Sequence, residues 1–418
     1  MKEARMNNSE KMILSIQSQD LERAKKYFKR ARSQDDPEVL LELAVYLEGI
    51  GFFSQAKTLY EQLLPIYPES ALQLAQIAND DGNVEEAFAY LEQIGSESPY
   101  YLEALLVKAD LYQSEGLTDV AREKLLEASR LSEEEIIRFG LAELDMELGF
   151  YQEAIEWYVQ LNHDELLELT GVSIYQRIGI AYARLGRFEV AIEYLEKSVE
   201  LEYDDTTLYE LAVLLYDQEE YQKANLYFKQ LDTLNPEFEG YEYPYAQSLH
   251  AEHQVDQAIT IAEKGLQKNQ YDSLMMLLIS QYAYEAHDPE KAERYLLLAK
   301  DNAEDLNEVL LRLSNLYLEQ ERYEDVVALA QEEFENVLTR WNLAKAFRAI
   351  EEDDRALTLY KELEDDLKEN PEFLQDMALY LKQLGDRKES ERLLKAYLQR
   401  VPDDMDMQVA LEDLQEEY

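Results

Sequence analysis

Apolar residues recur along this chain at the spacing of an α-helix. Between residues 37 and 64 they stand at Leu40, Leu43, Ala44 and Leu47, and again at Ala56, Leu59, Tyr60 and Leu63. Residues three and four positions apart share one face of a helix, so each set forms an apolar stripe. The segment is therefore predicted to be two amphipathic helices joined by a short turn.

The same pair of stripes returns throughout the chain, and an alanine marks the second helix. This anchor stands at Ala24, Ala56, Ala87, Ala121, Ala154, Ala191, Ala224, Ala258, Ala292 and Ala356, with Val326 and Ser390 in the same place. The mean of the eleven intervals between residues 24 and 390 is 33.3 residues. A nearly constant period of this length indicates a repeat architecture.

Three further columns follow the same register. Twelve residues before each anchor from Ala56 onward stands a small residue: Ala44, Ala75, Ala109, Ala142, Gly179, Ala212, Ala246, Ser280, Ser314, Ala344 and Ala378. Five residues before the anchor, six repeats have glycine: Gly51, Gly82, Gly116, Gly149, Gly186 and Gly385. Twelve residues after it, four have proline: Pro68, Pro99, Pro236 and Pro402.

Each column has a physical cause. Two helices approach closely only where small side chains face each other at the crossing. Glycine adopts the left-handed backbone conformation that ends many helices, and proline cannot continue a helix. The repeating unit is therefore predicted to be helix–turn–helix, and the chain to be nearly all α-helical, with about 24 helices.

These columns resemble the tetratricopeptide repeat (TPR) family, whose unit is a helix pair of about 34 residues. The sequence departs from the family at a tryptophan expected early in the first helix, where it mostly has leucine or tyrosine. The resemblance implies an all-α fold, an α-solenoid whose stacked helix-turn-helix repeats form a right-handed superhelix. As a whole the chain resembles long, acidic, all-TPR cytoplasmic proteins of Gram-positive bacteria.

The register also suggests how the chain is divided. We expect about eleven repeats over residues 37–402, a degenerate first repeat or cap in residues 1–36, and a capping helix in residues 403–418. One interval of 37 residues, between Ala154 and Ala191, predicts a bend or a longer loop around residues 162–171. Residues 1–36 hold nine Lys+Arg against six Asp+Glu, so they are basic in a chain of net charge −49.

The acidity limits the partners. With 89 Asp+Glu against 40 Lys+Arg, the chain lacks the general basic footprint that nucleic acids and anionic membranes require. There is no cysteine, which excludes disulfides, thiolate metal sites and a cysteine nucleophile. The longest apolar run, Leu274–Ile279, is far shorter than a membrane span, and no secretory signal is visible. We therefore expect a cytoplasmic protein.

No motif for catalysis or cofactor binding is present. The sequence has no phosphate loop, dinucleotide fingerprint, His-Glu-x-x-His or nucleophile elbow. His253 and His287 stand in the glycine column, and histidine is enriched among non-glycine residues with positive φ, so both are predicted to be turn residues. His250 and His253 also form a His-x-x-His pair, for which a metal site is the less favoured interpretation. The sequence thus predicts no enzyme, no cofactor and no metal.

Tyrosine is unusually frequent, with 31 residues. Many stand at positions predicted to be in the core, such as Tyr60, Tyr158 and Tyr360, each four residues after an anchor. We expect most tyrosines to fill the space between adjacent helices. The remainder could line a binding surface, because aromatic residues are favoured at interfaces.

The TPR resemblance also implies a binding groove, lined by certain positions of the first helix of each repeat. In the repeats anchored at Val326, Ala356 and Ser390 these positions hold Arg312, Asn315, Trp341, Asn342, Lys345, Arg348, Gln375 and Lys382. Four cations, two asparagines and one of the two tryptophans thus share one predicted face. The set resembles the clamps by which some TPR domains hold a peptide's carboxylate and backbone, although the family's five-residue clamp is not reproduced position by position.

Other interpretations of these residues remain. The four cations could instead pair with neighbouring acids such as Glu308, Glu319 or Asp376. A second candidate surface is the tyrosine-containing stretch from Tyr209 to Tyr284, and Arg177 with Arg184 form a weaker basic spot.

The leading functional hypothesis is a non-enzymatic scaffold or adaptor that binds a protein or peptide segment in its groove, because stacked repeats form a long concave surface. The alternative is an intracellular regulator that senses a peptide. A DNA-binding version of that regulator is disfavoured, because no basic N-terminal helix-turn-helix domain is visible. The partner's identity and the oligomeric state do not follow from the sequence, since the repeats specify a shape and leave the ligand to the groove side chains.

Overall fold

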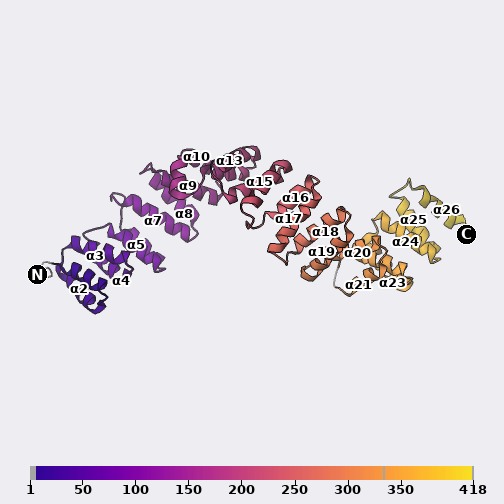
Figure 1. Cartoon of the computed structure of the whole chain (residues 1–418), viewed down its shortest axis with the longest axis horizontal. Helices are drawn as coiled ribbons and strands as arrows, with labels where there is room; N and C mark the ends of the chain where they lie inside the picture. Colours follow the sequence, from indigo (N-terminus) through magenta and orange to yellow (C-terminus); the bar gives the residue numbers. More distant parts are fainter. Residues whose placement is uncertain (1–5, 333–334, 417–418) are drawn as a thin grey trace. The chain divides into compact units, whose positions relative to one another are not determined.

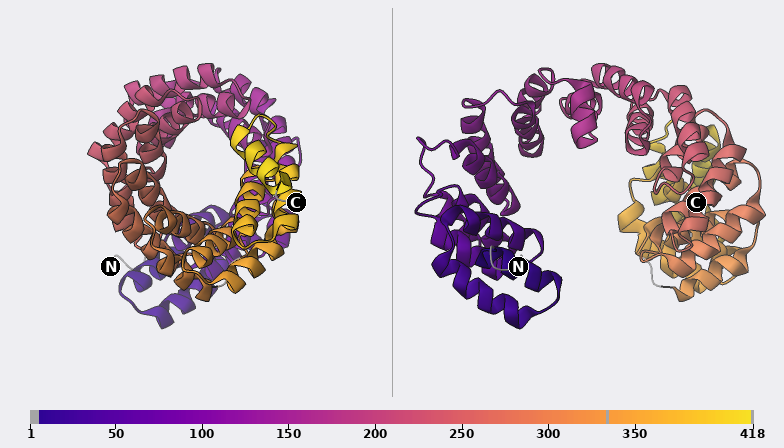
Figure 2. Two further views of the ribbon diagram at one scale, coloured as in Figure 1. Left: turned by 90° about the vertical axis from the view of Figure 1, so that its right-hand side faces the viewer. Right: turned by 60° about the vertical axis from the view of Figure 1, so that its left-hand side comes forward.

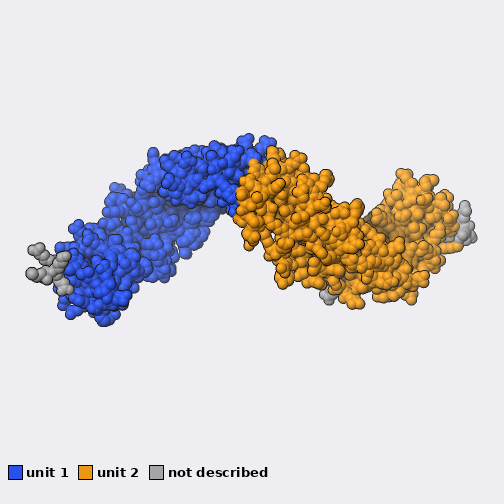
Figure 3. Space-filling model, in the orientation of Figure 1, with its two compact units in different colours: residues 1–214 blue, residues 215–418 orange. Residues whose placement is uncertain are grey.

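The structure is a computed structural model that describes residues 6–332 and 335–416. Within these residues it contains 26 α-helices and no strand, which confirms the all-α prediction. The chain divides into two compact units, residues 1–214 and 215–418 (Figure 3), and the division falls inside one helix. Each unit is described by itself. None of the described helices is long and apolar enough to cross a membrane.

The helices of the first unit are α1 (Asn8–Gln17), α2 (Leu21–Gln34), α3 (Pro37–Gly49), α4 (Phe53–Leu63), α5 (Ser70–Asp80), α6 (Val84–Leu91), α7 (Tyr101–Ser114), α8 (Thr118–Ser129), α9 (Glu135–Leu148), α10 (Tyr151–Tyr158), α11 (His163–Thr170), α12 (Ile174–Arg184), α13 (Phe188–Leu201) and most of α14 (Asp205–Asp217). The second unit begins within α14 and continues with α15 (Tyr221–Leu234), α16 (Glu242–Ala251), α17 (Val255–Lys268), α18 (Ser273–Glu285), α19 (Pro289–Asn302), α20 (Asn307–Glu319), α21 (Tyr323–Ala328) with the 3-10 segment η2 (Leu329–Gln331), α22 (Val337–Ala349), α23 (Asp353–Leu367), α24 (Pro371–Gln383), α25 (Arg387–Leu398) and α26 (Met405–Glu416).

The helices are arranged as consecutive pairs. Within each unit a helix packs mainly on the helices before and after it in the chain, so the pairs α1/α2, α3/α4 and their successors stack in order (Figures 1 and 2). The main packing contacts thus join helices that are neighbours in the sequence. This is the arrangement of a solenoid. The predicted α-solenoid of helix-turn-helix repeats is thereby confirmed.

The small residues lie where the helices of a pair cross. Every anchor residue and every residue of the small column is buried. In the α24/α25 pair the Oγ of the anchor Ser390 donates a hydrogen bond of 2.8 Å to the carbonyl of Ala378, so the two columns are in direct contact. In the α12/α13 pair a methyl group on Gly179 would lie 3.2 Å from the carbonyl oxygen of Ala191. Larger side chains at these positions would separate the helices.

The turn within each pair has one geometry in all twelve repeats. The residue five before the anchor has positive φ at the six predicted glycines and at His253 and His287, as expected. Gln19, Glu219, Glu321 and Glu351 complete the column with φ between 57° and 61°. In each case the next residue's N–H donates to the carbonyl five residues back, for example from Phe52 to Leu47 at 2.8 Å. This is the hydrogen bond of a Schellman helix end.

The irregular join at residues 162–171 is a helix, where a bend or loop was predicted. The Asn162 side chain accepts hydrogen bonds from the amides of Asp164 and Glu165 and caps α11, and Gly171, with φ 71°, ends it. Leu166 is buried in a cluster that includes Ile155 and Tyr158. Helix α10 packs directly on α12, so the additional residues form a helix beside the stack without interrupting it.

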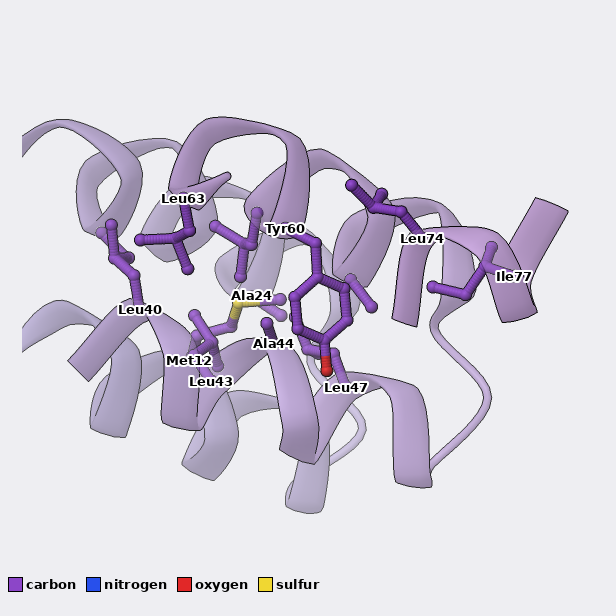
Figure 4. Packing of buried hydrophobic residues seen from close by; sticks show 13 residues of the cluster. Met12, Ala24, Leu40, Leu43, Ala44, Leu47, Tyr60, Leu63, Leu74 and Ile77 are labelled. Carbon is purple, nitrogen blue, oxygen red and sulfur yellow. The ribbon is translucent and has the colours of Figure 1, made fainter. Parts of the chain in front are cut away.

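In the first unit the buried residues form clusters that extend over neighbouring helix pairs. One cluster joins residues from α1 to α5 and includes Met12, Ala24, Ala44, Tyr60 and Leu74. In Figure 4 the leucines of α3 lie on one side of this cluster, and Tyr60 and Leu63 of α4 lie on the other. The Tyr60 ring is fully buried, as predicted, and Tyr158 and Tyr360 are equally buried.

Many tyrosine hydroxyls donate a hydrogen bond to a carboxylate. Hydrogen bonds from a tyrosine hydroxyl to an acidic side chain are formed by Tyr60, Tyr90, Tyr101, Tyr158, Tyr203, Tyr241, Tyr284, Tyr295, Tyr360, Tyr380 and Tyr397. At Tyr60 the hydroxyl lies 2.5 Å from Glu48. Burial and this contact raise the pKa of Tyr60. The ring packs in the core, while the hydroxyl donates a hydrogen bond to a carboxylate at the edge of the core.

We predict that Gly179→Ala destabilises the protein although alanine favours helices. The new methyl group would lie 2.7 Å from Cγ of Leu195 and 3.2 Å from the Ala191 carbonyl oxygen, and such overpacking costs roughly 1–3 kcal/mol. Gly49→Ala is the matched control, because nothing lies within 4 Å of its added Cβ. There the helix propensity should stabilise by up to about 1 kcal/mol. Urea unfolding followed by circular dichroism measures both. Stabilisation by both substitutions would contradict the close crossing.

We also predict that alkali unfolds the protein as its tyrosines ionise. Burial raises the pKa of Tyr245 and Tyr317 to about 12, against about 10 in an unfolded chain. The protonated hydroxyls therefore contribute stability that is present below about pH 10 and is lost between about pH 10 and pH 12. Tyrosinate absorbance and helicity, followed together, should change in one transition. Ionisation near pH 10 with helicity intact would contradict this assignment.

Candidate peptide-binding groove

Seven of the predicted groove residues, namely the four cations, the two asparagines and the tryptophan, lie on three successive first helices of the second unit. Arg312 and Asn315 are on α20, Lys382 is on α24, and the other four are on α22. Helix α22 packs against α20. The sequence register therefore places most of the set on two helices that are in contact.

A cavity of about 610 Å³ lies over α18, α20 and α22. Four predicted residues line it: Arg312, Asn315, Asn342 and Lys345. Gln281 and Tyr284 of α18 complete its wall. These two residues come from the stretch that the sequence offered as a second candidate surface, so the two candidate surfaces meet here.

A second cavity, of about 710 Å³, lies over α20, α22 and α24. Its lining includes Arg348, Asp353, Tyr380 and Gln383. Leu318, Glu319 and Lys345 line both cavities. The two cavities therefore adjoin at Lys345, and together they form what we call the groove.

The two asparagines are linked to each other. Nδ2 of Asn342 donates to Oδ1 of Asn315 at 2.6 Å and to Oγ of Ser314 at 2.9 Å. Asn342 is buried, whereas Asn315 is exposed at the wall of the first cavity. Asn342 thus holds the carboxamide of Asn315, which directs the Asn315 Nδ2 group away from the contact.

Arg312 pairs with an acid of its own helix. Its Nε lies 2.6 Å from Oε1 of Glu308, and its Nη1 donates to the carbonyl of Leu277 at 3.1 Å. These contacts agree with the second sequence interpretation, that the cations pair with neighbouring acids. Glu319, which was also considered as a partner for a cation, instead accepts a hydrogen bond of 2.7 Å from Tyr284.

Asp376 of α24 occupies the centre of a larger network. It accepts hydrogen bonds from Arg348 at 3.0 Å, from the Trp341 indole at 2.8 Å and from the Tyr360 hydroxyl at 2.6 Å. Trp341 is only 6% exposed, and its ring meets the edge of Phe373. The sequence predicted Trp341 and Arg348 to face a ligand and named Asp376 as an alternative partner for a cation, and the Arg348 ion pair agrees with that alternative. The structure shows both engaged with Asp376, which joins α22 and α23 to α24.

Lys345 differs from the other cations. Its Nζ lies 3.5 Å from the centre of the Trp341 ring, a cation–π contact. Across residues 6–332 and 335–416 no carboxylate forms an ion pair with it. Burial lowers the pKa of Lys345 despite the fields of Asp376 and Glu372. Lys345 is therefore a partly desolvated cation at the junction of the two cavities.

Lys382 lies apart from the groove. Its Nζ is 3.8 Å from Asp413 of α26, and it lines neither cavity. Of the seven predicted residues, five line the groove, Trp341 lies beneath Lys345, and Lys382 is elsewhere. The sequence set did not include Glu319 and Tyr380, which also line the groove.

The other candidates are engaged within the protein. The Nε2 atom of His250 contacts the Glu285 carboxylate and its ring stacks on Tyr282, while His253 occupies the turn. No group of three or more metal-binding side chains occurs among the described residues. In the first unit, Arg177 pairs with Glu143 at 3.0 Å.

We predict that Asp376→Ala destabilises the second unit. The substitution leaves the Trp341 indole, Arg348 and Tyr360 without their shared acceptor, and unsatisfied buried donors cost about 1–3 kcal/mol. A Trp157→Phe background makes Trp341 the sole tryptophan, so its emission reports the loss locally. Asp366→Ala, at an exposed position of α23, is the control and should change neither stability nor emission. If the two variants were equally stable, the hydrogen bonds to Asp376 would not stabilise the second unit and the prediction would be wrong.

Comparison with known proteins agrees with the repeat register. Models described as YpiA-like tetratricopeptide repeats match residues 113–166, and as YpiA-like C-terminal tetratricopeptide repeats match residues 338–404; a general tetratricopeptide repeat model matches residues 172–205. The C-terminal match includes α22 and α24 of the groove. The TPR repeat-containing protein YpiA of Bacillus subtilis (strain 168) is 28% identical over 396 residues, which cover 93% of each chain.

Two solved structures of tetratricopeptide repeat proteins have lower similarity to this chain. The C-terminal part of a TPR repeat-containing protein from Cytophaga hutchinsonii has a TM-score of 0.47 and 20% identity, covering 55% of this chain and 95% of that one. A tetratricopeptide repeat protein from Parabacteroides merdae ATCC 43184 has a TM-score of 0.39 and 16% identity, covering 59% and 98%. The family matches and the likeness to YpiA thus agree with the repeat register, and the chain is similar to tetratricopeptide repeat proteins over most of its length.

Proposed function

We propose that the protein is a non-enzymatic scaffold or adaptor, and that its groove binds an extended segment of a partner protein through a carboxylate. Repeat proteins of this family generally mediate protein interactions. The observation that carries the proposal is Lys345, a half-buried cation where the two cavities meet, which forms no ion pair with any residue that the structure describes.

Lys345 bears an electrostatic cost that a ligand can relieve. Burial disfavours its charged form, and an opposite charge close to it would favour that form again. A carboxylate at this point would make a charge-assisted hydrogen bond in a partly dehydrated environment, where such bonds are strongest. The Trp341 ring beneath Lys345 holds the ammonium group in place.

The rest of the groove favours one carboxylate over an acidic run. Glu319 lines both cavities and Asp353 lines the second, so a segment with several adjacent acids would meet repulsion on both sides of Lys345. The terminal carboxylate of a partner protein, or a single acid with neutral neighbours, avoids this repulsion. Asn315 and the carboxamides of Gln281 and Gln383 offer donors and acceptors for an extended backbone.

The net charge of −49 shapes how binding occurs. At low ionic strength it repels an acidic partner at long range and slows association. At about 0.15 M salt the Debye length is about 8 Å, so the repulsion is screened while the short contact with Lys345 persists. The expected association rate therefore rises with salt over this range.

The test is substitution of Lys345. Lys345→Met retains the aliphatic stem over Trp341 and removes the charge, and Lys345→Glu reverses it. Lys361→Glu, at an exposed position of α23, is matched to the reversal in net charge. Arg348 is not suitable, because its loss would also release Asp376. Tagged proteins are used to isolate partners from an extract of the source organism, and the bound proteins are identified by mass spectrometry.

Both Lys345 variants should lose a partner that the wild type and Lys361→Glu retain. For a peptide from that partner, the Kd should rise at least about 30-fold, equivalent to about 2 kcal/mol. Emission of Trp341 in the Trp157→Phe background provides the signal. Amidation of the peptide's C-terminus distinguishes a terminal carboxylate from a side-chain one. An unchanged partner set in both Lys345 variants would place the binding site elsewhere.

A further inference from the structure

The first repeat carries a basic surface that the groove does not use. Helix α2 has six Lys or Arg and one acid, Glu22, within fourteen residues. Lys26, Lys29 and Arg30 are exposed, and none of them forms an ion pair with any residue in 6–332 or 335–416. In a chain of net charge −49, a helix with three exposed cations that form no ion pair within the described residues is a local exception.

The basic side chains border an apolar cavity. The cavity of about 590 Å³ lies between α2 and α4. Leu21, Phe28 and Phe52 contribute to its apolar lining. Its polar rim consists of Lys25, Lys26 and Lys29 together with Glu22, which pairs with Lys25 at 3.0 Å. Leu21 remains 51% exposed. A hollow of this composition complements a helix with an apolar stripe and acidic flanks, whereas a uniformly hydrated anion would leave the aromatic rings uncovered.

The chain itself contains such a helix. Residues 403–416, which include α26, hold six acids and no base. Met405 is 67% exposed and Val409 is 52% exposed. Asp406, Glu412 and Asp413 are exposed as well, and the helical period places these five residues along one side. Leu414 is buried on the side that packs toward α25.

We propose that α26 of one copy docks in the cavity between α2 and α4 of another, so that the protein self-associates head to tail. Met405 and Val409 would cover Leu21, Phe28 and Phe52, while the acids of α26 would approach Lys26 and Lys29. The two surfaces are both exposed within one copy, and their charges are opposite. This association is separate from the groove, and the function proposed for the groove does not depend on it.

The surfaces involved indicate the form of the association. One helix in one cavity is a small interface, so the affinity is modest, with a Kd on the order of 100 µM or tighter. The contact is heterologous, because different surfaces of the two copies meet. A pair of copies therefore keeps one free cavity at one end and one free helix at the other. The mean mass should therefore rise continuously with concentration above the 48.9 kDa of one chain.

Sedimentation of the full-length protein tests the proposal at about 0.15 M salt, where repulsion between the acidic chains is screened. The first variant, Lys26→Glu/Lys29→Glu, reverses the rim of the cavity. The second, Asp406→Lys/Glu412→Lys, reverses the exposed side of α26. The control, Lys361→Glu/Lys368→Glu, makes the same change in net charge as the first variant at exposed positions outside the cavity. Circular dichroism verifies that each variant retains its helices.

The wild type and the control should associate, and each of the two charge-reversed variants should associate at least about tenfold more weakly. Loss in the α26 variant would be informative, because that variant has less net negative charge and less general repulsion. A mixture of the two variants should associate again, since the reversed rim of one meets the reversed helix of the other. Met405→Ser should weaken association with the charges intact.

Several outcomes would overturn the proposal. A mass that stays at one chain over all concentrations excludes self-association. Loss in the Lys26→Glu/Lys29→Glu variant alone, without loss in the α26 variant, means that another acidic segment occupies the cavity. Binding of the wild type to phosphatidylserine-containing vesicles, abolished by the Lys26→Glu/Lys29→Glu variant in the absence of self-association, would assign the surface to a membrane.

Discussion

The structure depends on the close crossing of two helices at small residues in each repeat. A single added methyl group at Gly179 would meet both Leu195 and the Ala191 backbone, and the Ser390 hydroxyl bonds directly to the backbone opposite. Because this contact sets the distance between the helices of a pair, it also sets how the pair meets the next one. The surface positions are then free to vary, and the groove side chains can differ from repeat to repeat without altering the stack.

Features encoded within one repeat could be predicted from the sequence, and those that depend on contacts between repeats could not. The crossing residues and the turn glycines follow from one register. Even α11 had a signal, since Asn162 and Gly171 are ordinary cap residues. In contrast, nothing in the spacing indicates that Asp376 accepts hydrogen bonds from Trp341, 35 residues away. The predicted positions led to the groove, but only the side-chain contacts distinguish Lys345 from Arg312 and Arg348.

The abundance of tyrosine is connected with the excess of acid. There are 89 Asp and Glu but only 40 Lys and Arg, so many carboxylates cannot have a cationic partner. A tyrosine hydroxyl donates to a carboxylate without adding charge, and its ring contributes to the core. Among the described residues, Glu48, Asp353 and Asp404 each receive such a bond from a buried tyrosine and form no ion pair. At these carboxylates a hydrogen bond from tyrosine thus takes the place of an ion pair with a cation.

The left-handed turns are distributed unevenly between the two units. In the first unit five of the six are glycine and the sixth is Gln19, whereas in the second unit only Gly385 is glycine. A side chain in this conformation costs on the order of 1 kcal/mol compared with glycine, so helix pairs of the second unit open locally at lower free energy. The groove is built on the pairs whose turns are Glu321 and Glu351. Their amide protons should exchange with solvent sooner than those of the first unit, and an occupant that bridges α20, α22 and α24 would slow that exchange.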